Sequence, residues 1–381
     1  MNNFVFQNPT KIIFGKGSIS SLTTEIPVER KILVTFGGGS VKTNGVYNQV
    51  KEALKGHQYI EFWGIEPNPA VETLRKAIEL AKKEKCDFVL AVGGGSVIDG
   101  SKLIAAGALH EEDAWDLIRK PALFKSALPL ASVLTLPATG SEMNRGAVIS
   151  NKATKEKFSF FSNYPVFSIL DPETTFSLPP YQVACGLADT FVHVIEQYLT
   201  TPNQSPLMDR WSESILLTII EVAPKVRKNQ YDYEAMATFM LSATMGLNGF
   251  IAMGVTQDWA THMIGHELTA LKGITHGHSL TILLPGTMWV LRAEKGDKII
   301  QYGKRIWGIE HNDKETAIKM IIDKTEEFFR SLGLKTRLSE NGVGEETINE
   351  IVRRFTERDV HVGENRSVDA QVARQILERV I

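Results

Sequence analysis

The chain has few cysteines, almost no excess charge and no long apolar run, and each shortage excludes a class of protein. Its 381 residues include two cysteines: Cys86 opens the run C-D-F-V-L-A-V, and Cys185 lies in Q-V-A-C-G-L. We therefore predict buried thiols in a reducing compartment rather than a disulfide framework. The formal net charge of −2 gives no reason to expect binding to nucleic acid or to an anionic membrane. No apolar run reaches the ~18 residues that suggest a membrane span.

The composition is that of an ordinary globular protein, with 43% hydrophobic and 23% charged residues. A chain of this length can form two or three domains. The first residues, M-N-N-F-V-F-Q-N-P, have neither the basic start nor the long apolar core of a secretory signal. We expect a cytoplasmic protein whose partners are small molecules rather than nucleic acid or membrane.

The first half of the chain alternates short apolar runs with segments of helical period. Strands are predicted over residues 31–36, 58–63, 87–92 and 131–137, with two further short strands around the turn at Asn8-Pro9. Helices are predicted between them, over residues 46–55, 71–84 and 97–106. Within the strand predicted over 87–92, residues 88–92 are continuously apolar, as expected for a parallel strand buried on both faces. This alternation predicts a doubly wound α/β domain.

The character of the sequence changes after Leu178–Pro180, where strand-like runs largely disappear. Long segments of helical period follow, for example over residues 212–223 and 323–332. We therefore predict an α/β domain over residues 1–180 and a helical domain over residues 181–381.

Histidines gather in one stretch of the second half, where four of the nine lie between His262 and His278. Asp189 and His193 are four residues apart, as are His262 and His266, so each pair shares one face of a helix. His276 follows a turn marked by glycine. A single histidine of this kind is more often packed or solvated, but the set together predicts a site for one divalent ion. Iron(II) and zinc are the natural candidates for such ligands.

Two Gly-Gly-Gly-Ser loops, Gly37–Ser40 and Gly93–Ser96, each follow an apolar strand. Glycines let the backbone approach a pyrophosphate, and free N–H groups at a helix start bind the anion. The second loop is the stronger signal, because it runs directly from a buried strand into a helix. Neither loop matches the G-x-G-x-x-G pattern, and either one could be a plain turn.

Taken together, these motifs resemble the iron-containing (group III) alcohol dehydrogenases over essentially the whole chain. The closest likeness is to their branch of NADPH-dependent butanol dehydrogenases and aldehyde reductases. The resemblance rests on F-G-K-G, G-G-G-S-V-K, E-P-N-P, G-G-G-S-V-I-D-G-S-K, L-P-A-T-G-S-E-M-N, D-T-F-V-H-V-I-E-Q-Y and D-W-A-T-H-M-I-G-H-E-L. It implies a dehydroquinate synthase-like fold, with an N-terminal dinucleotide-binding α/β domain on a parallel sheet and an all-helical C-terminal domain.

The resemblance also implies roles for single residues. The ligands of the Fe²⁺ or Zn²⁺ ion are expected to be Asp189, His193, His262 and His276, and His266 is expected to be an unligated catalytic histidine. Spacing alone does not separate His266 from His262. NADP(H) is expected to bind a set of loop residues: Gly37, Gly38, Gly39, Ser40, Asn68, Gly94, Gly95, Ser96, Asp99, Thr135, Thr139, Asn144 and Lys157. NAD users of the family tend to carry Asp at the position of Gly39.

The implied function is the reversible reduction of short- to medium-chain aldehydes to alcohols with NADPH. The resemblance also suggests a homodimer formed through the N-terminal strands. Two other activities are compatible with the same fold, a dehydroquinate synthase-like lyase and a polyol dehydrogenase. The apolar neighbourhood W-A-T-H-M-I-G-H offers little to a phosphorylated sugar acid. A non-enzymatic metal-binding scaffold is a third alternative, but a scaffold needs neither a full ligand set nor a phosphate loop.

Overall fold

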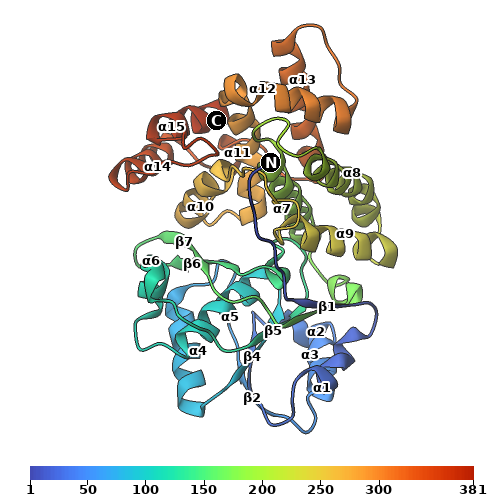
Figure 1. The fold of residues 1–381 in the computed structure, drawn as a ribbon, viewed down its shortest axis with the longest axis vertical. Coiled ribbons are helices and arrows are strands. Elements are labelled where there is room, and N and C mark those ends of the chain that lie inside the picture. The colour runs from blue at the N-terminus through green and yellow to red at the C-terminus, as the bar shows by residue number, and fades with distance from the viewer. The chain divides into compact units, whose positions relative to one another are not determined.

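The structure, a computed structural model, describes all 381 residues, which divide into two compact units (Figure 1). The α/β unit comprises Gln7–Leu178 and Gln230–Thr244, and the helical unit comprises Met1–Phe6, Pro179–Asn229 and Met245–Ile381. This division departs from a single cut at residue 180 in two places. The backbone N–H of Asn2 donates to Gly254, which ties the first residues to the helical unit. Thr244 donates to Glu142, which ties Gln230–Thr244 to the α/β unit.

The α/β unit is built on a six-stranded parallel sheet, as the alternation of strands and helices predicted. The strand order is β1-β8-β5-β4-β2-β3, and every neighbouring pair is parallel. The strands are β1 (Lys11–Phe14), β2 (Lys31–Phe36), β3 (Gln58–Phe62), β4 (Phe88–Gly93), β5 (Leu130–Leu134) and β8 (Phe167–Leu170). The central strands β4, β5 and β8 are buried along their whole length.

Helices cover both faces of this sheet, which explains why its strands are continuously apolar. Leu33 and Val89 point to one face and pack with α4 (Val71–Glu84) and α5 (Gly95–Gly107). Their neighbours Ile32 and Leu90 point to the other face and pack with α3 (Val46–Ala53). Shorter helices complete the unit: η1 (Ser18–Ser21), α1 (Leu22–Glu25), α2 (Ser40–Thr43), α6 (Ala114–Arg119), η2 (Pro121–Leu123), η3 (Ser141–Met143) and η4 (Pro172–Thr175).

Two local predictions of strands need correction. The segment Phe4–Phe6 forms no strand, although it has the apolar character of one, because it finds no pairing partner within this chain. The antiparallel hairpin of β6 (Gly146–Asn151) and β7 (Glu156–Phe161) was not predicted. Burial alternates along β6, but three consecutive apolar residues, Ala147–Ile149, hide this alternation in the sequence.

The second half of the chain is helical, as predicted. Its helices are α7 (Pro180–Tyr198), α8 (Pro206–Lys228), α9 (Tyr233–Gly246), α10 (Ala260–Lys272), α11 (His276–Val290), α12 (Arg292–Tyr302), η5 (Gly303–Trp307), α13 (Lys314–Ser331), η6 (Ser339–Asn341), α14 (Glu345–Glu357) and α15 (Ala370–Arg379). Helix α11 lies at the centre of the helical unit and packs against α7, α10, α13 and α15. None of the helices combines the length and the apolar character that crossing a membrane requires.

Candidate active site

The two glycine-rich loops lie side by side at the point where the strand order of the sheet reverses. From β2 the chain moves to β3 on one side, and from β4 it moves to β5 on the other. Strands β2 and β4 are direct neighbours, with Phe36 paired to Val92, so Gly37 and Gly93 follow at the same level. In open parallel sheets this reversal leaves a crevice at the carboxyl ends of the strands, where ligands bind.

The second loop is held in place by close packing of its glycines. Strand β4 ends at Gly93 and α5 begins at Gly95, so Gly94 alone connects them. A Cβ on Gly95 would overlap the side chain of Thr139, lying 2.7 Å from its Cγ2. A Cβ on Gly94 would lie 3.0 Å from Leu136. Glycine is therefore required for the 136–139 segment to pack on the start of α5, whose N–H groups can bind an anion.

The first loop requires glycine for a different reason. Gly39 has a φ of 105° and stands immediately before α2, in a region that L side chains rarely adopt. The ammonium of Lys42 lies 3.9 Å from the centre of the Trp63 ring, a cation–π contact that restricts where the charge can lie. The backbone conformation of the loop is therefore fixed by Gly39, and the position of its positive charge is restricted by Trp63.

Asn68 connects the second loop to the β6–β7 hairpin. Its backbone N–H donates to Ser96 Oγ at 3.3 Å, and its side-chain oxygen accepts from Lys157 Nζ at 2.8 Å. Lys157 lies on β7 and is 5% exposed, so its charge is held in the interior rather than solvated. Asn68 itself adopts a left-handed backbone conformation with φ of 55°. The structure thus brings Asn68, Ser96 and Lys157 together beside the start of α5.

Asp99, Thr135 and Asn144 are bonded within the α/β unit. Asp99 accepts from Ser141 Oγ at 2.6 Å and from the Val148 N–H at 2.8 Å, and burial raises the pKa of its carboxyl. The amide of Asn144 donates to Gly140 O at 2.9 Å. The Thr135 N–H donates to the carbonyl of Gly93 at 3.0 Å. These bonds fix the loops, and direct contact of the three residues with a cofactor stays a prediction.

Lys102, which the sequence analysis did not single out, organises the same region. It is fully buried and donates to Ser141 O, Asn144 Oδ1 and Gly146 O at 2.8, 3.1 and 2.6 Å. Burial lowers the pKa of its ammonium to about 8. A lysine one turn after Asp99, on the helix that follows a phosphate-type loop, is the signal that could have found it.

In the helical unit, side chains from three helices converge. Ligand atoms of Asp189 on α7, His262 on α10 and His276 on α11 all lie within 4.8 Å of one another. Asp189 Oδ1 lies 3.8 Å from His276 Nε2 and 3.9 Å from His193 Nε2. The His193 ring stacks on His262, with centroids 4.6 Å apart. Three of the four predicted ligands therefore converge on one point, and His193 lies beside them.

This donor set fits a divalent ion. Four ligands about 2.1 Å from a tetrahedral metal stand about 3.4 Å apart, close to the separations from Asp189 Oδ1. One carboxylate and three imidazoles suit iron(II) or zinc, and the charge of Asp189 offsets part of the charge of the ion. Asp189, His193 and His262 are buried, and His276 is partly exposed. The structure therefore supplies a shielded site with one partly open side.

Gly277 allows α11 to approach α7 closely enough for His276 to reach Asp189. A Cβ at this position would overlap the carbonyl oxygen of Cys185, 2.9 Å from its carbonyl carbon, and would stand 3.2 Å from Asp189 Cβ. The obstacle is backbone, which cannot move aside as a flexible side chain can. The glycine between His276 and His278 is therefore a condition of the site.

The remaining two histidines of the stretch differ in their surroundings. The ring of His266 lies 5.2 Å from that of His276 and 6.4 Å from that of His262, but its nitrogens are not part of the convergent group. His278 faces away, with Tyr181 Oη 2.9 Å from its Nδ1 and Lys335 O 3.1 Å from its Nε2. Geometry thus separates His262 from His266, which spacing could not.

Glu196 is a second residue that the sequence analysis did not single out. It lies on α7, seven residues after Asp189, and accepts from the backbone N–H groups of Thr261 at 2.6 Å and His262 at 3.2 Å. The same carboxylate contacts His262 Nδ1. Burial, reinforced by the neighbouring Asp258, raises its pKa. The spacing of 189, 193 and 196 along one helix face is the signal that could have found it.

The aromatic residues near the site fall into two groups. The Trp259 ring makes edge-to-face contacts with the His262 ring at 5.3 Å and with the His193 ring at 6.2 Å, so it borders the convergent group. Phe250 stacks on Trp211 at 4.3 Å and contacts Phe6. Phe250 therefore packs against the N-terminal segment.

Comparison with known families finds matches along both units. Residues 9–172 match the family described as iron-containing alcohol dehydrogenase, and residues 183–381 match the C-terminal region of the same family. The chain is 48% identical over 384 residues to the NADPH-dependent aldehyde reductase YqhD of Escherichia coli, covering 99% of each chain. It is 43% identical to the probable NADH-dependent butanol dehydrogenase 1 of Bacillus subtilis, covering 92% of each.

Solved structures give the same result for the fold. The crystal structure of Escherichia coli YqhD superposes with a TM-score of 0.98 at 47% identity, covering 100% of this chain and 99% of that one. The fold class expected from the sequence, an α/β dinucleotide-binding unit followed by a helical unit, is therefore confirmed.

Substituting Gly277→Ala should remove bound metal and lower the free energy of unfolding, because the added methyl group meets the Cys185 carbonyl. Overpacking of this kind costs about 1–3 kcal/mol. Metal content is measured by mass spectrometry of the purified protein, and stability by denaturant unfolding. Gly344→Ala is the matched control, since nothing lies within 4 Å of a Cβ there. Full metal occupancy in Gly277→Ala would contradict the role assigned to this close approach.

Proposed function

Because the chain belongs to the iron-containing alcohol dehydrogenase family, we propose that it is a metal-dependent NADPH:aldehyde reductase that also works in reverse as an alcohol dehydrogenase. The observation that carries the proposal is the convergence of Asp189, His262 and His276 on one point of the helical unit, with His193 Nε2 3.9 Å from Asp189 Oδ1. The two glycine-rich loops at the reversal of the sheet supply the second requirement, a dinucleotide site.

Each group of residues has a distinct task in this reaction. When bound, NADPH supplies the hydride and the divalent ion supplies Lewis acidity toward the carbonyl oxygen. Asp189, His193, His262 and His276 hold the ion, and the ligand set admits iron as well as zinc. His266, buried beside His276, passes a proton from a ring nitrogen to the product oxygen, directly or through water.

The α/β unit orients the cofactor. The backbone N–H groups at Gly94, Gly95 and Ser96 bind the pyrophosphate, because they stand free at the start of a thirteen-residue helix. Lys157, held by Asn68, adds a buried positive charge next to this loop. Thr135 and Thr139 lie on the segment that packs against Gly93 and Gly95, so they border the same crevice.

The substrate class follows from the neutral surroundings of the ligand stretch. Trp259 and Met263 flank His262 in the sequence, and the Trp259 ring contacts the His262 imidazole edge to face. Such a pocket suits aliphatic and aromatic aldehydes and has little to offer a phosphate. It also discriminates weakly between chain lengths, because one methylene is worth only about 1–3 kcal/mol.

We expect reduction of aldehydes from C2 to C8 with NADPH, with comparable kcat/KM along the series and loss of activity after chelation. The measurement is the steady-state oxidation of NADPH with this panel, beside glyceraldehyde 3-phosphate and, in the reverse direction, glycerol. Readdition of Fe²⁺ or Zn²⁺ restores activity if chelation removed only the metal. Strong selectivity for the phosphorylated or polyol substrate, with butanal inert, would overturn the substrate class.

Two histidine variants separate binding of the metal from catalysis. His262→Ala should abolish both bound metal and activity, because it removes a ligand from the centre of the group. His266→Ala should retain most of the metal and lower kcat by about 10²–10⁴-fold, the usual contribution of a positioned acid. Metal analysis and kcat are measured on the same preparations. Unchanged metal content in His262→Ala would refute the ligand assignment.

A preference for NADPH over NADH is supported by the first glycine loop. An enzyme selective for NAD usually places an acidic side chain where the ribose 2′-hydroxyl lies, and it would repel a 2′-phosphate. Here Gly39 has no side chain, Ser40 adds a hydroxyl, and Lys42 adds a charge held over Trp63. The loop is therefore favourable to the extra phosphate.

Gly39→Asp should shift the ratio of kcat/KM for NADPH and NADH toward NADH by more than about tenfold, through repulsion of the 2′-phosphate. Because Gly39 has a positive φ, the variant also carries backbone strain. Gly39→Asn is the matched control, since it imposes similar strain without charge. An equal shift in both variants would show that strain, and not charge, is the cause. A wild-type preference for NADH would overturn the argument.

We further propose a cytoplasmic homodimer. Strand β1 is at the edge of the sheet, where its unpaired backbone groups can bind another strand, and Phe4, Val5 and Phe6 are exposed. The two cysteines are free and buried, as in proteins of reducing compartments.

Light scattering of the purified protein should give twice the mass of the chain. Val5→Glu should shift the distribution toward monomer, because the side chain of Val5 is 99% exposed in the single chain. A monomeric wild-type protein at micromolar concentration would rule out the dimer.

A further inference from the structure

We infer that Glu196 is a positioning residue that selects which nitrogen of His262 faces the metal. The inference rests on the proposed metal site and adds to it a residue that is not a ligand. It begins from the helix α7, where Asp189, His193 and Glu196 are spaced by four and three residues and share one face. Glu196 is 3% exposed, so its carboxylate finds its partners within the protein.

The carboxylate of Glu196 holds the first turn of α10. That helix begins at Ala260, and its first N–H groups have no partners within the helix. Asp258 Oδ1 accepts from Ala260 N at 2.9 Å, while Glu196 Oε1 accepts from Thr261 N at 2.6 Å. Glu196 Oε2 accepts from His262 N at 3.2 Å and contacts His262 Nδ1. One carboxylate therefore fixes both the backbone and the ring of His262.

This contact determines the tautomer of the ring. Both oxygens of Glu196 already accept backbone N–H groups, so the carboxyl stands here as an acceptor and the ring nitrogen that faces Oε2 is the donor. A neutral His262 protonated at Nδ1 leaves the lone pair on Nε2, on the side that can face Asp189 and His276. Metal-binding histidines in general donate their other ring N–H to such a group, which fixes the ring and raises the basicity of the ligand nitrogen.

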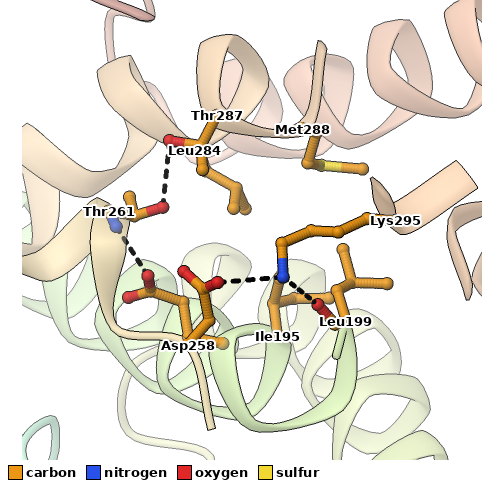
Figure 2. A pocket seen from close by; sticks show the side chains of 9 residues that line it. Ile195, Leu199, Asp258, Thr261, Leu284, Thr287, Met288 and Lys295 are labelled. Carbon is orange, nitrogen blue, oxygen red and sulfur yellow. Dashed lines mark hydrogen bonds and ion pairs between the residues drawn. The ribbon is translucent and has the colours of Figure 1, made fainter. Parts of the chain in front are cut away.

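A buried ion cluster lies next to Glu196 and is joined to its helix. A cavity of about 20 Å³ lies behind it, enough for roughly one water molecule. Figure 2 shows Lys295 pointing into this cavity, with its ammonium bonded to Asp258 and to the carbonyl of Leu199. Glu364 completes the buried ion cluster at 2.8 Å from the same ammonium. The Asp258 N–H donates to Glu196 O at 2.9 Å, which joins the cluster to α7.

Glu196→Gln tests the inference with almost no change in shape. In one orientation of the glutamine amide, its NH₂ group faces the backbone N–H and Nδ1 of His262, so donor meets donor. In the other orientation, the NH₂ group faces the backbone N–H of Thr261, with the same conflict. Neither orientation reproduces the carboxylate. We expect the affinity of the apoprotein for Co²⁺ to fall about 10–100-fold, the usual effect of losing such a partner. Affinity is measured by competition with a chromophoric chelator, on chain whose folding is checked by circular dichroism.

A comparison of conservative variants separates the charge of Glu196 from its packing. If the carboxylate matters, Glu196→Asp retains more Co²⁺ affinity than Glu196→Gln, although Asp is shorter. If only shape matters, the isosteric Gln is the better substitute, and the inference is overturned. Glu213→Gln is the matched control, because Glu213 is a buried carboxylate of α8 that accepts from Tyr198 and Arg305. Its Co²⁺ affinity should equal that of the wild type.

Nitrogen NMR of the metal-free wild type, with ¹⁵N-labelled histidine, reports the tautomer directly. We expect the His262 signals to show a protonated Nδ1 and an unprotonated Nε2, and the opposite pattern would overturn the inference. Failure of the proposed function has a different signature. In that case the wild-type protein itself would bind no Co²⁺ at one equivalent, whatever the variants do.

Discussion

The contact of α11 with α7 at Gly277 is the constraint on which the metal centre depends. Three helices contribute the convergent side chains, and their sequence positions span Asp189 to His276. Such a group forms only if the helix backbones approach within the reach of short side chains, and a single methyl group at residue 277 would prevent it. The glycines of the second loop act in the same way in the α/β unit, where Gly95 makes room for Thr139. In both units the chemistry depends on positions where a side chain is absent.

Much of the fold and of the metal site could be predicted from the sequence, because both depend on the spacing of residues that are close along the chain. The period of the apolar residues predicted the parallel sheet and the helical second half. The spacing of Asp189 and His193 predicted that they share one helix face. The hairpin β6–β7 was missed, since its alternation is short and interrupted by a turn. Phe4–Phe6 has the composition of a strand, but pairing depends on a neighbour that composition cannot reveal.

The residues that support others were the hardest to find. Glu196 and Lys102 lie within two of the quoted motifs, but their roles depend on contacts with residues 66 and about 40 positions away. Buried charges of this kind are recognisable only when their partners are known, because an isolated Glu or Lys on a helix is most often solvated. The same holds for His262 and His266. Their spacing in the sequence allows either one to be the ligand, and only their surroundings in the structure tell them apart.

The division of labour between the units has a consequence for how the protein responds to its ligands. All convergent ligand residues belong to the helical unit, and all of the expected dinucleotide-binding residues belong to the α/β unit. A ligand stabilises the structure that binds it in proportion to the logarithm of its concentration over its Kd. Scarcity of metal therefore lowers the stability of one unit directly, while scarcity of NADP(H) lowers that of the other. In a cell, proteolytic sensitivity of each unit would report a different shortage, one of metal supply and one of reducing cofactor.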